Sequence, residues 1–529
     1  MRKIFVRTLA AVVCLAACLE AAPVTKRPKL LLTIVLDQFR YDFLVRHRDQ
    51  FKGGFVRLLE HGAVFSNANY DHFPTVTAVG HSTIMSGSIP AISGIVENEW
   101  YDGELQRDRT SVEDAGTRLL GAGTTTRHGS SPKLLMTSTV GDELRMAHPQ
   151  AKVIGLSLKD RSAILTVGHT ATASYWFDSK TGNFVSSSYY FPEGKSIPAY
   201  VEQFNAKRVP DRWIGKPWLP IDGDHGGKPL LTLPSAAGET YYEALTYSTF
   251  GNDVLEEFTE RVIDVEELGA DGFTDILTVS FSSNDLVGHR YGPDSPQVRD
   301  VTLRTDLLLD KLLKFVDKEV GLSETAIVLT SDHGICPMPE AILPLRMDAG
   351  RIPKEQVIER VNTALAKRFG VQGKWVDGKG VRSLYLNQAL IREAKITEAQ
   401  AEAAAAETLR SMRHIYRVYT KSDLARNRVG NDPIDQRVRN GFYAPRAANL
   451  FVIADPYYTF GSNGIDHGSP FTYDTNVPVI FLGRWFKAGL YTTPIRVNDI
   501  APTLSAILEL PAPSGNVGRP LTEIFVSMN

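Results

Sequence analysis

The 529-residue sequence has few cysteines: only Cys14, Cys18 and Cys336 are present. Three cysteines exclude a disulfide framework and a cysteine-ligated zinc site. Charge of one sign is not in excess either, because 58 Lys and Arg stand against 60 Asp and Glu, a formal net charge of −2. No general basic field therefore indicates a nucleic-acid partner. Any metal must be held by histidine and carboxylate side chains.

Long apolar runs are also scarce, and the most prominent one, residues 9–19, follows a basic start at the N-terminus. Such a segment is too short to span a bilayer comfortably and is typical of a secretory signal, predicted here over residues 1–22. Cleavage near Ala22 would give a soluble periplasmic product. The residues before Cys18 also resemble a bacterial lipobox, and cleavage there would leave Cys18 as a lipid anchor at the outer membrane. Both alternatives stay open, and no further run predicts a transmembrane span.

The remaining apolar segments predict an α/β fold. Short runs that are apolar throughout are typical of strands buried on both faces of a parallel sheet. Helical patterns lie between them, the clearest at Gln297–Val320 with apolar residues at i, i+3 and i+4. This alternation predicts a doubly wound, largely parallel central sheet flanked by helices. The predicted strands are Leu30–Leu36, Val153–Leu158, Ile276–Phe281, Ala326–Leu329, Leu450–Ile453 and Val477–Leu482.

Two stretches interrupt the alternation of strands and helices. Residues 180–245 are rich in Tyr, Trp, Pro and Gly and predict an irregular insertion. Residues 340–446 have a pattern of their own. It contains a predicted helix at Pro353–Phe369, a predicted strand at Val381–Leu386 and a helix that opens with the capping box Thr397–Gln400. We interpret both stretches as cap insertions in one catalytic domain that covers residues 26–529.

Residues that can bind metals or anions follow several predicted strands. Ligands in open α/β sheets bind beyond the carboxyl ends of the strands, so these residues are expected to meet in one site. Each has an ordinary explanation when taken singly, such as a helix N-cap or a surface pair. Together, three carboxylates and three imidazoles suffice for two Zn²⁺ ions, which can hold both reacting oxygens of a phosphoryl transfer. The residues are Asp37, Lys159, Arg161, Asp285, His289, Asp332 and His333 at strand ends, and His467 in a loop.

A candidate nucleophile lies in the segment Phe73–His81, just before the helix-like residues 82–86. A hydroxyl at a helix N-terminus meets an anion where free N–H groups and the helix dipole favour negative charge. Metal coordination would lower the pKa of such a hydroxyl and make it a nucleophile at neutral pH. Thr75 and Thr77 both lie there, and a simple N-cap role would explain either one alone.

With these motifs the chain resembles the alkaline phosphatase superfamily, in its type I phosphodiesterase/nucleotide pyrophosphatase branch. It is most similar to the exported bacterial alkaline phosphatases of PafA type, over nearly the whole mature chain. The motif Pro-Thr-x-Thr-x-x-x-His implies that Thr77 is the catalytic nucleophile, and Asn98 falls where the family has a phosphate-contacting Asn. The resemblance also implies two zinc sites, one formed by Asp285, His289 and His467, the other by Asp37, Asp332, His333 and the Thr77 oxygen.

The pair Lys159 and Arg161 separates two activities of this branch. In the phosphatases that the chain resembles, a Lys-x-Arg pair reaches the non-bridging phosphate oxygens, and the diesterases lack it. The division agrees with the charges of the substrates. A transferring monoester phosphoryl group carries its charge on three equatorial oxygens, so extra cations stabilise it, whereas a diester has one charge fewer and a second organic group in that space.

The sequence therefore predicts a zinc-dependent enzyme that hydrolyses small-molecule phosphate monoesters through a covalent phospho-threonine and releases phosphate outside the cytoplasm. A phosphodiesterase or nucleotide pyrophosphatase with the same two metals is the nearest alternative. A sulfatase is less favoured, because no Cys or Ser lies in a Cys/Ser-x-Pro-x-Arg motif. A metal-containing binding protein on an inactive scaffold is a further alternative, against which the intact ligand set argues. Neither the physiological substrate nor the oligomeric state follows from the sequence.

Overall fold

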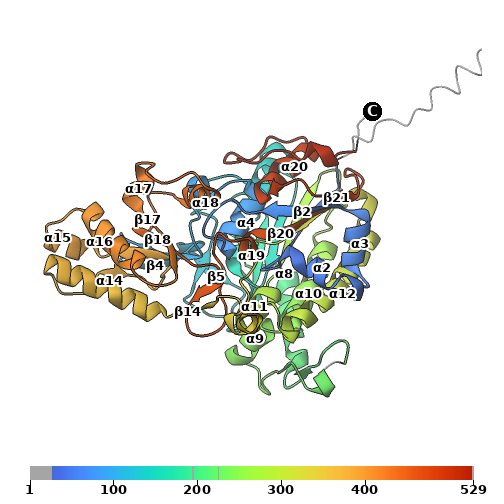
Figure 1. Cartoon of the computed structure of the whole chain (residues 1–529). Helices are drawn as coiled ribbons and strands as arrows, with labels where there is room; N and C mark the ends of the chain where they lie inside the picture. Colours follow the sequence, from blue (N-terminus) through green and yellow to red (C-terminus); the bar gives the residue numbers. More distant parts are fainter. Residues whose placement is uncertain (1–26, 193–195, 224, 527–529) are drawn as a thin grey trace, which may run out of the picture.

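Figure 1 shows the computed structural model of the chain, which describes residues 27–192, 196–223 and 225–526. The predicted signal peptide and Cys18 lie outside the described residues. Among the helices that are described, none is both long and apolar enough to cross a membrane.

A large sheet of twelve described strands forms the centre of the molecule, and its middle is parallel. The parallel strands lie side by side in the order β13, β1, β12, β7 and β8. This confirms the predicted α/β class with a largely parallel central sheet. The bounds are β13 Thr325–Thr330, β1 Leu30–Leu36, β12 Asp275–Phe281, β7 Val153–Ser157 and β8 Ala173–Asp178.

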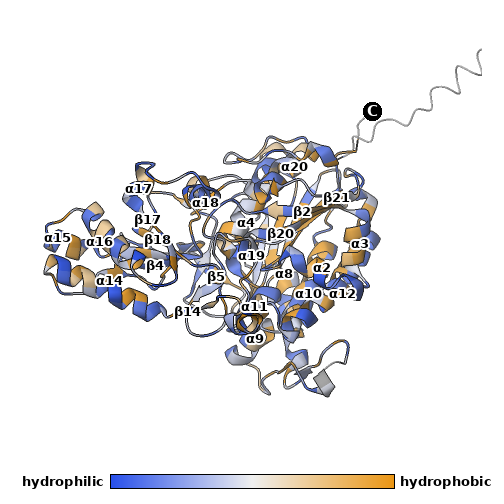
Figure 2. Cartoon of the chain, in the orientation of Figure 1, coloured by the Kyte–Doolittle hydropathy of each residue, from blue (hydrophilic) through white to orange (hydrophobic). Residues whose placement is uncertain are grey.

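Every residue of β1 is buried, because helices cover both faces of the sheet. Side chains alternate between the faces of a strand. Ile34 and Leu36 therefore join one apolar cluster, with α10 (Thr249–Val265) and α12 (Pro296–Glu319). Leu31 and Val35 join the opposite cluster, with α4 (Thr77–Ser86), α6 (Val140–Ala147) and α20 (Ile500–Ile507). Figure 2 shows apolar residues gathered around the inner strands and hydrophilic ones frequent on α12.

Antiparallel pairs join the flanks of the sheet to its parallel middle, which corrects one sequence prediction. The run Val477–Leu482 was expected in the parallel part, but β20 (Asn476–Leu482) pairs antiparallel with β13 and with β2 (Ala63–Asn69). On the other flank, β9 (Asn183–Ser187) runs antiparallel to β8. An apolar run indicates that both faces of a strand are covered, and it does not indicate the direction of the strand.

A second prediction is wrong for the run Leu450–Ile453, which does not belong to the central sheet. Its strand, β18 (Leu450–Ala454), lies in a separate four-stranded sheet and pairs antiparallel with β16 (Ser383–Leu386) and β17 (Ile415–Thr420). This cap sheet and its helices lie to one side of the main sheet (Figure 1). The run is apolar because the cap has its own core, formed with β15 (Val376–Asp377), α14 (Lys354–Phe369) and α16 (Glu398–Arg410).

The predicted helices of the cap are present. Helix α14 begins one residue after Pro353 and ends at Phe369 as expected. The capping box at the start of α16 forms in both directions: the N–H of Gln400 donates to Thr397 Oγ1 (3.2 Å), and the N–H of Thr397 donates to Gln400 Oε1 (2.8 Å). The capping box predicted from the local sequence therefore stabilises the start of α16.

The other insertion, residues 180–245, contributes β9 to the central sheet and also contains α8 (Ala199–Ala206) and α9 (Glu239–Thr246). Its large side chains are buried in the main apolar cluster, among them Phe204 and Trp218. Burial of these rings explains its aromatic composition.

Candidate active site

The carboxyl ends of four adjacent parallel strands carry most of the predicted site residues. Asp37 follows β1, and Asp332 with His333 follows β13. Asp285 and His289 lie on α11 (Ser283–Tyr291), the helix that begins just after β12, and Lys159 follows β7. The remaining histidine, His467, comes from the loop between β19 (Tyr458–Phe460) and α19 (Thr472–Thr475). The site thus brings together residues as distant in sequence as Asp37 and His467, which are 430 positions apart.

Two groups of three potential metal ligands form there, with the memberships that the sequence predicted. Within each group, one ligand atom per residue lies within 4.8 Å of the others. The groups are adjacent, because the rings of His333 and His467 stack with centroids 3.5 Å apart. Groups of three N and O ligands suit a divalent cation such as zinc. The groups are Asp285, His289 and His467, and Asp37, Asp332 and His333.

All three imidazoles are oriented by the same kind of hydrogen bond. In each, Nδ1 lies within hydrogen-bond distance of a backbone carbonyl oxygen, which fixes Nδ1 as the protonated nitrogen. The other nitrogen, Nε2, then faces the site and can offer its lone pair to a metal once it is deprotonated. The three pairs are His289 with Ile465 (2.7 Å), His333 with Gly334 (2.9 Å) and His467 with Thr75 (2.8 Å).

Within the two ligand groups, two buried carboxylate oxygens, Asp37 Oδ1 and Asp332 Oδ2, have no hydrogen-bond partner among the described residues. Such atoms are costly unless a cation or donor reaches them. The second oxygen of Asp332 is held in place, because it accepts the backbone N–H of Gln38 at 3.0 Å. The side chain of Gln38 donates to Asp285 Oδ1 at 2.7 Å, so this one residue contacts both groups. Fixed carboxylates with free oxygens fit a pair of bound cations.

The electrostatics of the two groups differ. Burial raises the pKa of Asp285, but His289 and Lys159 outweigh burial and hold the pKa well below its ordinary value. Burial also lowers the pKa of His289, yet Asp285 outweighs it and raises that pKa to about 9. Burial and the nearby Asp332 raise the pKa of Asp37 well above its usual range. Additional positive charge beside Asp37 would keep this carboxylate ionised.

Lys159 lies between the two groups. Its Nζ is 2.6 Å from Asp37 Oδ2 and 2.5 Å from Asp285 Oδ2. Burial lowers the pKa of Lys159, but the two carboxylates outweigh burial and raise it, so the side chain is an ammonium. Buried carboxylates in a low-dielectric site attract the nearest cation. The ammonium of Lys159 therefore lies in the gap between the two ligand groups.

Of the two candidate nucleophiles, only Thr77 faces a ligand group. It is the first residue of α4, and its Oγ1 lies 3.3 Å from Nε2 of His333. Thr75 has a different environment: its hydroxyl donates to the carbonyl of Ser469 (2.9 Å), and its own carbonyl accepts from His467. Thr75 therefore supports the loop that carries His467, while Thr77 presents a buried hydroxyl to the site.

Asn98 changes the picture of the helix N-terminus. Its Oδ1 accepts the backbone N–H of Ala78 at 2.7 Å, so this early N–H of α4 is not free to meet an anion. Because Oδ1 is the acceptor, the amide Nδ2 of Asn98 is left to donate elsewhere. Asn98 thus occupies the N–H of Ala78 and offers the N–H groups of its own side-chain amide as donors instead.

Arg161 lies in the first turn of α7 (Asp160–Leu165), and α7 packs against α4. Its Nε is buried and has no hydrogen-bond partner among the described residues. Lys159 is the residue just before this helix, and burial and the charge of Arg161 both act to lower the pKa of Lys159, against the carboxylates that raise it. The two cations of the Lys-x-Arg pair are therefore near each other, and Lys159 is the one that contacts the ligand groups.

Sequence reasoning gave no role to three residues that hold the site together, one of them His81, the histidine of the motif Pro-Thr-x-Thr-x-x-x-His. Gln38 adopts a left-handed backbone conformation (φ 64°) to contact both groups. His81 lies within hydrogen-bond distance of the Thr77 carbonyl (2.9 Å) and of Ser280 Oγ (2.8 Å), which joins α4 to β12. The third residue is Arg382 of the cap, which donates to the backbone carbonyl of His467. His81 follows Thr77 at i, i+4, a spacing that could have indicated the contact, whereas no sequence signal marks the other two.

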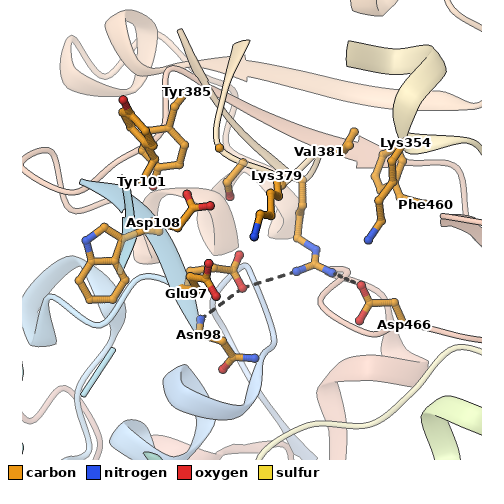
Figure 3. Close-up of a pocket in the computed structure, with 16 residues that line it drawn as sticks. Glu97, Asn98, Tyr101, Asp108, Lys354, Lys379, Val381, Tyr385, Phe460 and Asp466 are labelled. Carbon is orange, nitrogen blue, oxygen red and sulfur yellow. Dashed lines mark hydrogen bonds and ion pairs between the residues drawn. The ribbon is translucent and has the colours of Figure 1, made fainter. Parts of the chain in front are cut away.

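An open cavity of about 310 Å³ lies between the segment around Asn98 and the cap, and residues of both line it (Figure 3). Asn98 and Asp466, which precedes His467, lie at its inner end. Tyr101 and Tyr385 line one wall, and the side chains of Lys354 and Lys379 extend into the space from the cap (Figure 3). The cavity is the space in which the organic part of a substrate would fit.

Comparison with known proteins agrees with this geometry. The chain matches the type I phosphodiesterase / nucleotide pyrophosphatase family over residues 31–474. It is 33% identical to alkaline phosphatase PafA of Elizabethkingia meningoseptica, covering 94% of this chain and 95% of PafA. It is 34% identical to alkaline phosphatase PhoV of Synechococcus elongatus, covering 94% of this chain and 93% of PhoV.

The crystal structure of PafA superposes with a TM-score of 0.87 at 32% identity, covering 95% of this chain and 99% of the other. A PafA variant with substitutions of one Thr, one Asn, one Lys and one Arg superposes with a TM-score of 0.86. Fold, site and relatives together define an enzyme of the alkaline phosphatase class. The chain belongs to the type I phosphodiesterase/nucleotide pyrophosphatase family within the alkaline phosphatase superfamily.

Proposed function

We propose that the chain is a zinc-dependent phosphomonoesterase that acts outside the cytoplasm through a phospho-threonine intermediate. One observation carries the proposal: the Thr77 hydroxyl lies against one ligand group while the ammonium of Lys159 lies between both. A nucleophile and a fixed cation at a two-metal site are what transfer of a dianionic phosphoryl group requires.

Two zinc ions would be held by the two groups, one by Asp285, His289 and His467 and the other by Asp37, Asp332 and His333. The Nε2 atoms that face the site, and the two carboxylate oxygens without a hydrogen-bond partner among the described residues, support this assignment. Zinc bound there would supply Lewis acidity and positive charge for the phosphoryl oxygens. The donor set of imidazole and carboxylate suits zinc, and no thiol is among the ligands.

Thr77 carries the covalent step. Its Oγ loses its proton and attacks phosphorus in line, and the Oγ–P bond forms as the bond from phosphorus to the leaving oxygen breaks. The leaving oxygen takes up a proton in exchange and departs as the alcohol. Water then attacks the phospho-threonine, phosphate is released, and the Thr77 hydroxyl is regenerated with a proton from that water. The helix N-terminus of α4 favours negative charge on Oγ during both steps.

Asn98, Lys159 and Arg161 bind the phosphoryl oxygens. The amide Nδ2 of Asn98 and the two cations are hydrogen-bond donors only, as an oxyanion requires. The substituted Thr and Asn of the PafA variant are 21 positions apart, as are Thr77 and Asn98, and its Lys and Arg are two apart, as are Lys159 and Arg161. The matching residue types and spacing support the same four positions in this chain.

The proposal is tested with an aryl phosphate monoester and its methyl diester. We expect a higher kcat/KM for the monoester with the wild type, and Thr77→Ala should lower kcat by at least about 10³-fold. Acid quenching during turnover should trap phosphate on Thr77 of the wild type alone, detected by peptide mass spectrometry. Thr75→Val is the matched control at the other threonine and should leave a phosphorylated Thr77. Phosphate release by Thr77→Ala at the wild-type rate would contradict the mechanism.

The family name favours one second function, a phosphodiesterase or nucleotide pyrophosphatase with the same site. Lys159 argues against it, because its ammonium occupies space beside the phosphoryl position where a second organic group would lie. Faster hydrolysis of the diester than of the monoester would support this second function instead.

The location and the domain boundaries are proposed from the sequence: a signal peptide at residues 1–22 and a catalytic domain at residues 26–529 with insertions at about 180–245 and 340–446. Intact mass of the exported protein from a Gram-negative host tests the cleavage point. A mass that corresponds to a chain cleaved near Ala22 indicates a soluble periplasmic enzyme. Labelling with palmitate at Cys18 indicates a lipid anchor. Retention of the full-length chain in the cytoplasm would contradict export.

A further inference from the structure

Arg382, just before β16, extends from the cap to the inner end of the cavity. Its guanidinium lies between Glu97 and Asp466, 3.6 Å from Glu97 Oε1 and 3.1 Å from Asp466 Oδ2. The side chain is 18% exposed and Glu97 is 16% exposed, so the contact is largely shielded from water. Arg382 is separated by 85 residues from His467 and by 284 from Asn98, and neither the fold nor the proposed chemistry requires an arginine there.

One set of contacts of Arg382 holds the backbone of His467, through its carbonyl and through Asp466. Its Nη2 donates to the carbonyl of His467 (2.5 Å) and to Asp466 Oδ2 (3.1 Å). The other oxygen of Asp466 accepts the backbone N–H of His467 at 3.0 Å. The imidazole is held separately by Thr75. The main chain of His467 is therefore tied to the cap through one guanidinium, while its ring is tied to the main domain.

On the other side Arg382 contacts the segment that carries Asn98. Its Nη1 lies 3.6 Å from Glu97 Oε1, an ion pair. The same oxygen accepts the backbone N–H of Asn98 at 3.4 Å. A guanidinium presents several donors in a rigid plane, which allows one side chain to contact both segments at once.

The chain around Gly468 is shaped to admit this side chain. Gly468 has a φ of 105°, and a Cβ at this position would lie 2.4 Å from Cζ of Arg382. The guanidinium therefore packs directly on the backbone that follows His467. A glycine at a position of positive φ allows this close approach.

We propose that Arg382 is a positioning residue through which the cap sets His467 and Asn98 relative to each other. The inference rests on the proposed function, in which His467 binds zinc and Asn98 binds a phosphoryl oxygen. The cap is then part of the catalytic apparatus as well as a wall of the cavity. Lysine cannot replace Arg382 fully, because one ammonium cannot reach the carbonyl of His467 and both carboxylates in this planar arrangement.

The test compares Arg382→Gln and Arg382→Lys with Arg417→Gln. Arg417 is a matched control, a cap arginine that pairs with Asp432 (2.6 Å) and Asp435 (3.0 Å) and belongs to β17. Zinc content is measured after dialysis against graded chelator, together with kcat, KM for an aryl phosphate and the inhibition constant of inorganic phosphate. We expect Arg382→Gln to lose one of two zinc ions at about 10-fold lower chelator strength, and to bind phosphate more weakly. Arg382→Lys should recover part of both, and Arg417→Gln should resemble the wild type.

Wild-type zinc retention and an unchanged inhibition constant in a folded Arg382→Gln would overturn the inference. If that variant does not fold, Asp466→Asn and Glu97→Gln test the two links separately, with Arg382 in place. The first should affect zinc retention and the second phosphate inhibition, and no change in either would overturn the inference. A wild type that binds zinc but releases no phosphate would contradict the proposed function instead, and the zinc measurements would still report on Arg382.

Discussion

Lys159 is the single residue whose contacts bear most directly on the choice of substrate. Its ammonium is shared by Asp37 and Asp285, one carboxylate from each ligand group. A cation fixed at this point stabilises a phosphoryl group with charge on three oxygens more than one with charge on two.

We therefore expect the double variant Lys159→Ala and Arg161→Ala to lower kcat/KM for an aryl monoester by about 100-fold or more. The loss for the methyl diester should be at least about 10-fold smaller. Lys152→Ala is the control, because Lys152 lies at the opposite end of β7 and pairs with Glu266. Equal losses for the two substrates would show that the pair is structural.

Asp474 gives a prediction on pH. Burial raises its pKa to about 7, although the backbone N–H of Ser469 donates to Oδ2 at 2.7 Å. Since the folded pKa exceeds the unfolded one near 4, the contribution of this group to stability is fully present below pH 4 and is lost as the pH rises through 7.

Asp474→Asn removes this dependence. In chelator, which removes any contribution of metal, the free energy of unfolding of the variant should exceed that of the wild type by an amount that grows with pH. The growth is at most about 1.4 kcal/mol per pH unit between pH 4 and 7, with a plateau above pH 7. A difference that does not change with pH in denaturant titrations would mean that Asp474 is ionised throughout this range.

At the residue scale the sequence predicted the groups at strand ends but not the residues that orient them. Asp37 and Asp332 could be found because each lies within two residues of the end of an apolar strand. The sequence could not separate Thr75 from Thr77 without the family motif, since both lie before the same helix, and the hydrogen bond from Thr75 to Ser469 distinguishes them only in three dimensions. Gln38 acts through its left-handed backbone conformation, which leaves no mark on the sequence pattern.

Helix α4 is the element on which the position of the nucleophile depends. At Gly80, a Cβ would lie 2.1 Å from the backbone oxygen of Asp332. The helix can therefore approach the end of β13 only with glycine at this position. This contact sets the distance between Thr77 and His333.

Gly80→Ala should displace α4 and lower kcat/KM by about 100-fold, since a shift near 1 Å has that effect on an aligned nucleophile. Overpacking should also reduce stability by about 1–3 kcal/mol. Ser82→Ala, in the same buried helix, is the control and should keep most activity. Full activity in Gly80→Ala would show that α4 tolerates the displacement.

The elements themselves were predicted with unequal success. The parallel strands β1, β7, β12 and β13 were found because a strand covered on both faces is apolar throughout. The same rule placed Leu450–Ile453 in the wrong sheet, since the buried core of the cap makes its strand equally apolar. Apolar runs report burial, and the identity of the partner strand depends on contacts distant in sequence.

At the scale of the whole molecule, the two ligand groups join segments from Asp37 to His467. A ligand that binds only the folded state stabilises it by mass action. Zinc removal with chelator should therefore lower the free energy of unfolding by about 2.7 kcal/mol per site when free zinc had stood at 100 times Kd. The Tm should fall with it, and activity should be abolished. Added zinc should restore both, whereas an unchanged Tm after complete removal would mean that the groups hold no metal in the folded protein.

The central place of β1 has a consequence for how the protein is made. Leu30 pairs in register with Asp275 on one side and Thr325 on the other, so the first strand to be synthesised is flanked by strands that emerge about 245 and 295 residues later. Until then, seven residues that all become buried have neither neighbour to pair with. Such distant pairing slows folding and exposes an aggregation-prone edge in the meantime. A chaperone that holds the unfolded chain until its second half has emerged would therefore raise the yield of this enzyme more than one that acts after synthesis is complete.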